Sequence, residues 1–319
     1  MKRFIYIFKG QFLCFIELDL EKYDLKEIKL DGLSSLEYLR LALKSVEYIL
    51  FGNMFALRKL NLCISSPIDS DMSSKLFDNL PNIKSLGLFL KLCNFELMNN
   101  LKKDFNLDLL NNKCNDLEDL SICSTSIDDE NIAEIFNDYH FSKLSSLTIN
   151  CFYQFTKIEK KLFVGRFPIL QKLIINSNKN LWTIEDEAFS SLKHLNYLEM
   201  WSNSIKSLYK MNFSHLTNLE TLKLCDNQIE RIEDNTFAKL NNLRMLDLKC
   251  NKLSSVNPQS FFGLSKLNNL ILCNNKLTKF DLAILKNIPQ IESIDLRRNP
   301  IENKDILNRF KDSKIKFLL

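Results

Sequence analysis

Cysteine and histidine are the side chains of this 319-residue sequence that carry atoms suited to metal binding or redox chemistry. The chain has nine cysteines, and no two of them form a C-x-x-C pair. The three histidines, His140, His194 and His215, are not spaced as zinc ligands are. An odd number of cysteines cannot all pair within one chain, and unpaired thiols fit a reducing compartment. We therefore predict no metal site, no cofactor and no disulfide framework.

The composition argues against an enzyme. Six glycines make up about 2% of the chain, against roughly 7% in average proteins, so Gly-rich phosphate loops are not expected. No nucleophile–base pair can be assembled from the sequence. The 43 basic and 39 acidic residues leave a net charge of +4, which is too small to favour nucleic acid or an anionic membrane. No stretch approaches the roughly 18 apolar residues of a membrane span. The prediction is a non-catalytic chain with no nucleic-acid ligand, no small-molecule cofactor and no membrane span.

A group of aromatic, charged and apolar side chains predicts a protein-binding site. Aromatic residues beside Arg, Lys and Met have the composition of protein-binding hot spots. The group consists of Tyr197, Glu199, Trp201, Lys223, Met245, Asp247, Lys249, Ile271, Asp295 and Arg297. It can act as one binding site only if the fold brings these positions onto one surface.

An internal repeat provides such a surface. Its core is an apolar residue, two residues of any type, a second apolar residue, one of any type and a third apolar residue. Copies begin at Leu36, Leu57, Ile83, Leu117, Leu144, Leu170, Leu195, Leu219, Leu243, Leu267 and Ile291, with a partial copy at Ile315. The successive spacings from Leu36 are 21, 26, 34, 27, 26 and 25 residues, followed by 24 residues five times. A spacing held this strictly indicates a repeat architecture.

The pattern also predicts where side chains lie. Apolar residues three and five positions into each copy alternate as in a short strand, and stacked strands form a parallel sheet with an apolar interior. Eight residues into each regular copy comes an asparagine, whose amide carries donors and an acceptor for buried backbone groups. These asparagines are Asn178, Asn203, Asn227, Asn251, Asn275 and Asn299. Phenylalanines near offset eighteen are expected to fill the opposite, convex half: Phe189, Phe213, Phe237 and Phe261.

The chain resembles leucine-rich repeat proteins. The passages LETLKLCDNQIERIEDNTFAKLNN and LRMLDLKCNKLSSVNPQSFFGLSK are similar to the "typical" 24-residue subfamily found in Toll-like, Slit-like and proteoglycan-type ectodomains. The resemblance implies an α/β solenoid, a horseshoe with a parallel concave sheet and an irregular or helical convex side. It also implies that partners bind the concave face, where offsets two, four and six carry the ten recognition residues. The cysteine-rich caps of those ectodomains are absent.

We expect one solenoid over residues 1–319. It divides into an N-terminal cap with a degenerate first copy (1–35), irregular longer copies (36–169), regular copies (170–300) and a C-terminal cap (301–319). The irregular copies show Ser65, Lys91 and Thr125 at offset eight and are expected to contain convex helices, one of them over 132–139. A short helix and a closing strand are expected within 306–319.

Two functional interpretations remain. The first is a non-catalytic scaffold that binds a protein ligand through its concave face, with receptor- or matrix-type ligand recognition as one form of this role. The alternative is an intracellular adaptor or substrate-recognition subunit of a ubiquitin ligase. The family resemblance favours an extracellular or cell-surface location, and Asn212 begins a glycosylation sequon. The lack of a predicted signal peptide and the unpaired cysteines favour the cytoplasm.

Overall fold

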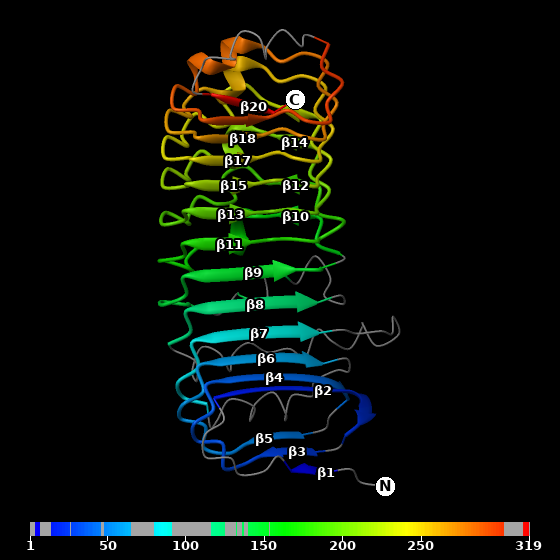
Figure 1. Cartoon of the computed structure of the whole chain (residues 1–319). Coiled ribbons are helices and arrows are strands. Elements are labelled where there is room, and N and C mark those ends of the chain that lie inside the picture. Colours follow the sequence, from blue (N-terminus) through cyan, green and yellow to red (C-terminus); the bar gives the residue numbers. More distant parts are fainter. Residues whose placement is uncertain are drawn as a thin grey trace. The chain divides into compact units, whose positions relative to one another are not determined.

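The computed structural model describes residues 4–6, 14–25, 27–45, 48–64, 80–90, 116–124, 132, 136, 140–152, 154–302 and 315–318. The chain forms two compact units, Met1–Gln154 and Phe155–Leu319. Both are stacks of coils, and each coil contributes one strand to a parallel sheet (Figure 1). Within the described ranges, no helix is long and apolar enough to cross a bilayer.

The Met1–Gln154 unit contains two parallel sheets. The smaller sheet has the order β1 (Phe4–Tyr6), β3 (Glu27–Leu30) and β5 (Tyr48–Phe51). The larger sheet follows the chain order β2 (Phe15–Asp24), β4 (Tyr38–Ser45), β6 (Lys59–Ile64), β7 (Ser85–Leu90), β8 (Asp119–Ser124) and β9 (Ser146–Asn150).

The apolar positions of the repeat form the interior of this unit. One register row joins Leu39, Leu60, Leu86, Leu120 and Leu147, and every member is fully buried. Full burial of a leucine side chain contributes about 1.5–3 kcal/mol, so these rows dominate the stability of the stack. The convex helix predicted over 132–139 lies largely outside the described residues. Of its apolar set, Ile132 and Phe136 are described and are buried.

The Phe155–Leu319 unit has a sheet of shorter strands. In order, they are β11 (Lys172–Ile174), β13 (Tyr197–Glu199), β15 (Thr221–Lys223), β17 (Met245–Asp247), β18 (Asn269–Ile271), β19 (Ser293–Asp295) and β20 (Lys316–Leu318). Two parallel pairs lie outside this sheet: β10 (Lys157–Ile158) with β12 (Thr183–Ile184), and β14 (Ser207–Leu208) with β16 (Arg231–Ile232).

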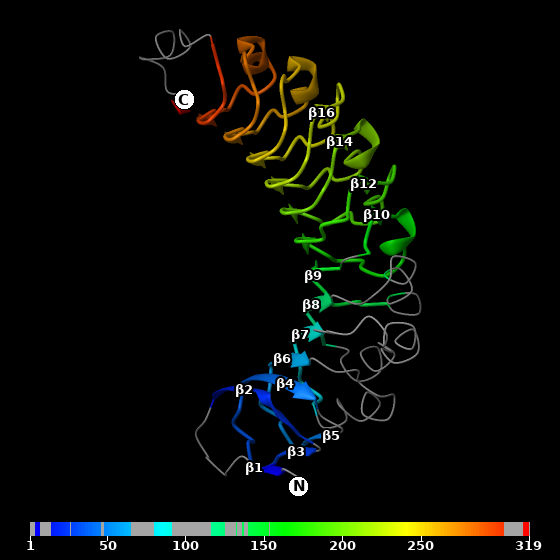
Figure 2. The same ribbon diagram turned by 90° about the vertical axis from the view of Figure 1, so that its right-hand side faces the viewer.

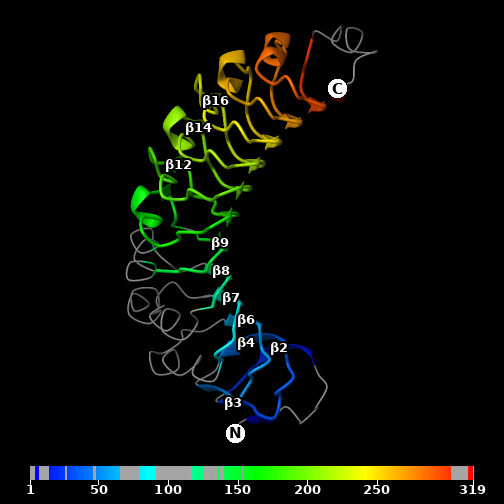
Figure 3. The same ribbon diagram turned by 90° about the vertical axis from the view of Figure 1, so that its left-hand side faces the viewer.

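Short 3₁₀ helices lie on the side of this unit opposite its main sheet. They are η2 (Lys160–Leu162), η3 (Lys210–Asn212), η4 (Pro258–Phe261) and η5 (Leu282–Lys286). Within the unit the strands line the inner, concave side of the curve, and the helical turns fan out on the convex side (Figures 2 and 3). The predicted α/β solenoid of the leucine-rich repeat type is therefore confirmed.

Stacked phenylalanine rings fill the convex half of this unit; the sequence predicts the last four of the five rings, and the structure adds Phe163. Successive centroids of Phe163, Phe189, Phe213, Phe237 and Phe261 lie 5.8, 6.4, 6.1 and 6.1 Å apart. All five rings are buried. Aromatic pairs at such distances contribute about 0.5–1.5 kcal/mol beyond their buried area, so the stack joins consecutive coils.

An asparagine ladder, comprising the six residues at offset eight from Asn178 to Asn299, joins the coils near the strand ends. Asn251 is representative. Its Nδ2 donates to the carbonyl oxygens of Leu224 and Leu248, both at 3.0 Å, and its Oδ1 accepts the backbone N–H of Ile229 at 3.0 Å. Leu224 and Ile229 belong to the preceding coil. The amides of Asn227, Asn251, Asn275 and Asn299 therefore satisfy backbone groups of two coils at once.

The residue before each asparagine has a left-handed backbone. The φ angles lie between 55° and 59° at Ser177, Ser202, Asp226, Cys250, Asn274 and Arg298. This conformation costs a non-glycine residue roughly 1–2 kcal/mol, and it turns the chain away from the sheet toward the convex side. The hydrogen bonds of the ladder offset that cost.

The C-terminal end of the sheet is covered by β20, the closing strand predicted within 306–319. It pairs in parallel with β19, with Ser293 opposite Lys316 and Asp295 opposite Leu318. Phe317 packs edge-on against the buried Phe280, with ring centroids 6.4 Å apart. The helix predicted in the same segment lies outside the described residues.

Candidate binding face

Strand register places the ten predicted recognition residues on one face of the Phe155–Leu319 unit, here called the concave face. One row joins Tyr197, Thr221, Met245, Asn269 and Ser293 on neighbouring strands. The next row joins Ile174, Glu199, Lys223, Asp247, Ile271 and Asp295. Three more residues each lie two positions after the end of a strand, and their side chains are exposed: Trp201, Lys249 and Arg297.

The densest polar contacts surround Tyr197. Its hydroxyl donates to a carboxylate oxygen of Glu199, and Asn176 Nδ2 donates to Glu199 Oε1 at 2.8 Å. The Lys223 ammonium lies 3.4 Å from Glu199 Oε2. The ammonium groups of Lys172 and Lys223 lie 5.4 and 5.2 Å from the centre of the Tyr197 ring, on strands at either side of it. These are cation–π distances, so the ring is held by charge as well as by packing.

Trp201 completes this group, here called the Tyr197 cluster (Lys172, Asn176, Tyr197, Glu199, Trp201 and Lys223). The backbone N–H of Trp201 donates to Asn176 Oδ1 at 2.9 Å, so one amide orients both the tryptophan backbone and Glu199. The tryptophan is 40% exposed, although its neighbours in the cluster are mostly half-buried. The cluster therefore presents an open apolar ring beside polar groups that already have partners.

The protonation states of the cluster follow from these contacts. Burial raises the pKa of the Tyr197 hydroxyl, and its hydrogen bond to Glu199 raises that pKa further. Burial alone would raise the pKa of Glu199, but the hydrogen bonds from Tyr197 and Asn176 and the charge of Lys223 lower it overall. The hydrogen bond with Tyr197, with the charge of Glu199 adding to it, raises the pKa of Lys223. At neutral pH the cluster holds a neutral phenol, a carboxylate and an ammonium.

Asp295 and Arg297 form a second fixed pair on the concave face. The guanidinium donates through Nε to Oδ1 at 3.0 Å and through Nη2 to Oδ2 at 2.8 Å, and the backbone N–H of Arg297 also reaches Oδ1 at 3.1 Å. The hydrogen bonds from Arg297 lower the pKa of Asp295. The pair is therefore ionised, with the Asp295 carboxylate covered and the Arg297 side chain exposed on the surface.

Two thiols lie between these charged groups. Burial, followed by the charges of Asp247 and Glu199, raises the pKa of Cys225 to about 12. Burial, followed by Asp295, raises the pKa of Cys273 to about 11. Both thiols are protonated at neutral pH, whereas nucleophilic and metal-ligating cysteines are thiolates. Neither thiol is therefore in the form that attacks a substrate or binds a metal.

The structure adds residues to this face that sequence reasoning did not select. Lys172 and Asn176 belong to the Tyr197 cluster but lie on β11 or just beyond it, in the first of the regular copies. Their offsets, two and six, are the same as those of Tyr197 and Trp201. Extending the recognition positions to every copy would have identified both.

Asn212, the asparagine of the predicted glycosylation sequon, lies in the interior. It is 1% exposed, its Nδ2 donates to the carbonyl oxygen of Ile184 at 3.1 Å, and its Oδ1 accepts the N–H of Tyr209 at 2.8 Å. A glycan is attached through this same nitrogen and needs a surface position. The folded unit therefore offers no accessible acceptor at Asn212.

Comparisons with known proteins agree with this architecture. A family model described as "Leucine rich repeat" matches residues 142–205, 168–224, 193–253, 217–277 and 242–301. No curated protein sequence matches significantly. Among solved structures, the chain is similar to one from a crystal structure of a TLR13–ssRNA13 complex, with a TM-score of 0.60 and 19% identity. The match covers 95% of this chain and 51% of that one, so this chain spans about half its length.

Proposed function

Because the chain belongs to the leucine-rich repeat family, we propose that it is an interaction scaffold that binds another protein through the concave face of the Phe155–Leu319 unit. Solenoids of stacked repeats expose extended concave surfaces that suit this role. The observation that carries the proposal is the exposed ring of Trp201 beside the fixed polar groups of the Tyr197 cluster.

This cluster has the physical properties of a binding hot spot. An exposed tryptophan gains apolar contact area when a partner covers it, and tryptophan and tyrosine are enriched among residues that dominate binding energy. The hydrogen bonds and cation–π contacts hold Tyr197, Glu199 and Lys223 in place before binding. Side chains that are already ordered lose little entropy on association. The cluster should therefore contribute more affinity than its area alone.

The charge pattern supports a protein ligand over nucleic acid. Along the row Ile174, Glu199, Lys223, Asp247, Ile271 and Asp295, three carboxylates accompany one ammonium. A face that follows a phosphate backbone needs a continuous stripe of cations. The similar TLR13 structure contains RNA. We infer a different ligand class for this chain, because its central row would repel a polyanion.

The test compares the two tryptophans of the chain. Trp201 lies on the concave face, whereas Trp182, which is 51% exposed, precedes β12 outside the main sheet. Partners are identified by affinity purification with quantitative mass spectrometry, and the dissociation constant of the purified partner is then measured by calorimetry. Trp201→Ala should weaken binding at least tenfold, since hot-spot truncations cost about 2 kcal/mol or more. Trp182→Ala should leave it unchanged.

Two further measurements make the test decisive. Both variants should keep the wild-type melting temperature within about 2 °C, because neither ring is part of the core. A labelled single-stranded RNA should show no saturable binding to the chain. Equal partner affinity for wild type and Trp201→Ala, or saturable RNA binding lost with that variant, would remove the proposed protein site.

A further inference from the structure

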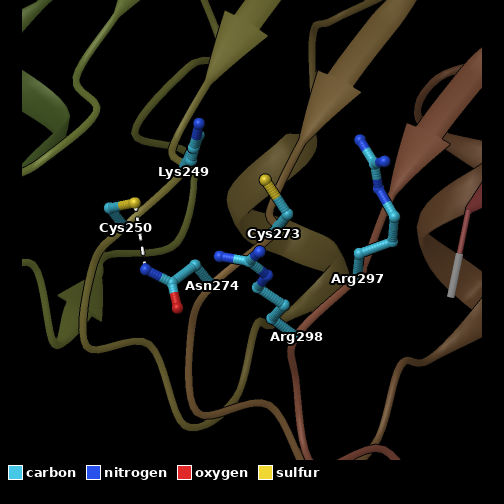
Figure 4. Close-up of a pocket in the computed structure, with 6 residues that line it drawn as sticks. All are labelled: Lys249, Cys250, Cys273, Asn274, Arg297 and Arg298. Carbon is cyan, nitrogen blue, oxygen red and sulfur yellow. Dashed lines mark hydrogen bonds between the residues drawn. The ribbon is translucent and has the colours of Figure 1, made fainter.

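A basic pocket lies beyond the ends of β17, β18 and β19, at the edge of the concave face. Its volume is about 230 Å³, and it is lined by Lys249, Cys250, Cys273, Asn274, Arg297 and Arg298. Figure 4 shows the Cys273 side chain between those of Lys249 and Arg297, and the Arg298 guanidinium turned back toward Cys273 and Asn274. The pocket is therefore lined by cationic side chains from two coils.

The pocket arises from an alternation of long and short side chains. Lys249, Cys273 and Arg297 occupy the same offset in three consecutive copies. Neighbouring strands lie about 4.8 Å apart, so the backbones that carry Lys249 and Arg297 are separated by roughly 10 Å. The buried cysteine between them is too short to fill the gap. Long side chains thus form the walls, and a protonated thiol forms the floor.

The charges around the pocket are only partly compensated. The guanidinium of Arg297 is paired with Asp295, and the Asp247 carboxylate accepts the backbone N–H of Lys249 at 2.9 Å. Within the part of the chain that the structure describes, neither the Lys249 ammonium nor the Arg298 guanidinium makes an ion pair. Asn274 adds an amide, of which Nδ2 donates to the Cys250 sulfur at 3.0 Å and keeps a second N–H for a ligand.

We propose that this pocket binds a phosphate monoester dianion, held by Lys249 and Arg298 with Arg297 and the Asn274 amide as further donors. A dianion matches two cations that make no ion pair, whereas a single carboxylate would leave one of them uncompensated. The planar guanidinium groups suit the oxygens of a phosphate group. Nucleic acid is a less suitable ligand. Its neighbouring phosphates would have to lie near the carboxylates of Asp247 and Asp295, which would repel them.

The proposal is independent of partner-protein binding, because phosphate can be titrated against the chain alone. Calorimetry at fixed ionic strength measures binding of inorganic phosphate, of a blocked phosphoserine peptide, and of dimethyl phosphate as a monoanionic control. Saturable binding of the first two, at least tenfold tighter than that of dimethyl phosphate, is expected. Tighter binding of the peptide would identify a phosphorylated side chain as the source, and tighter binding of inorganic phosphate a small free ion.

Charge-matched variants locate the site. Lys249→Gln with Arg298→Asn removes both of these cationic groups, and asparagine tolerates the left-handed backbone at position 298, as Asn274 already does. This double variant should weaken phosphate binding at least tenfold. The control Lys276→Gln with Lys279→Gln removes the same charge from exposed lysines outside the pocket and should bind as wild type does.

Three results would overturn the assignment. They are no saturable binding of either phosphate ligand at millimolar concentration, equal loss of affinity in both double variants, and stronger binding of a single-stranded oligonucleotide than of phosphate. Circular dichroism confirms that each variant is folded before titration. Trp201→Ala should leave phosphate binding intact, so failure of this proposal and failure of the proposed protein site are distinguishable.

Discussion

Each unit contains a tyrosine at offset two of a copy, Tyr38 in the first unit and Tyr197 in the second. The same kinds of side chain surround both rings, but these side chains are more exposed around Tyr38. In the Met1–Gln154 unit the Tyr38 hydroxyl donates to Glu17 Oε1 and accepts from Asn61 Nδ2, both at 3.2 Å. Lys59 lies 5.6 Å from the ring centre, and Phe15 stacks on the ring with centroids 4.4 Å apart. We call these five residues the Tyr38 cluster.

The carboxylate shows the difference most clearly. Glu17 lies on β2, the first strand of its sheet, and its side chain is 46% exposed. Glu199 lies on β13, between β11 and β15, and its side chain is 14% exposed because both neighbours supply contacts. The same residue types therefore form a loose surface group at a sheet edge and a fixed group inside a sheet. Position in the stack, more than residue type, determines which cluster is preorganised.

The largest expected effect tests this difference directly. Glu199→Ala leaves the Tyr197 hydroxyl and the Asn176 amide without their acceptor in a half-buried site, so unfolding free energy should fall by about 1–3 kcal/mol. Glu17→Ala should lower the free energy of unfolding by no more than about 0.5 kcal/mol, because water replaces the lost contacts. Urea denaturation measures both. Equal losses in the two variants would contradict the comparison.

The pH dependence of stability separates charge from packing in the Tyr197 cluster. Because the folded pKa of Glu199 is lowered, its ionised form stabilises the fold above the ordinary glutamate pKa of about 4.3, and this stabilisation is lost as pH falls through the folded pKa. The stability difference between wild type and Glu199→Gln should be constant from pH 7 to 5 and shrink below about pH 4. A difference that persists unchanged at pH 3 would mean that packing, not charge, fixes this side chain.

The smallest effect is expected from Gly87→Ala, a substitution next to Asn61 of the Tyr38 cluster. A Cβ at Gly87 would collide with the side-chain oxygen of Asn61 and would touch the Phe89 ring at 3.0 Å. Asn61 can rotate away, which breaks its hydrogen bond to Tyr38 at a cost of under about 1 kcal/mol. Tyrosine side-chain NMR shifts should change for Tyr38 and stay constant for Tyr197. A loss of several kcal/mol would show that Asn61 is fixed as firmly as Asn176.

The sequence predicts the fold far better than it predicts the contacts of the binding face. The apolar pattern of each copy determines strand position, register and which side chains are buried, so the leucine rows were predictable even where the spacing between copies varies. The strict 24-residue spacing made the phenylalanine stack predictable from Phe189 to Phe261. Contacts between long side chains of different coils depend on rotamers, which spacing does not determine. Asn176 bridging Glu199 and Trp201 is such a contact, and so is the pocket above Cys273. The sequence around Asn212 predicts a glycosylation site on the surface, but the Asn212 amide makes hydrogen bonds inside the unit, which the sequon does not indicate.

The asparagine ladder makes the stack directional. Asn227 accepts the N–H of Ile205, Asn251 that of Ile229, and Asn275 that of Leu253, so each coil is completed by the coil that follows it. If coils were removed from the C-terminal side, the new last coil would lose the asparagine oxygen that accepts its backbone N–H, and no other group of the ladder would replace it. Shortening the stack from the N-terminal side leaves the amides of Asn227, Asn251, Asn275 and Asn299 with a carbonyl of their own coil, such as Leu248 for Asn251. Unravelling under tension should therefore start at the C-terminal end.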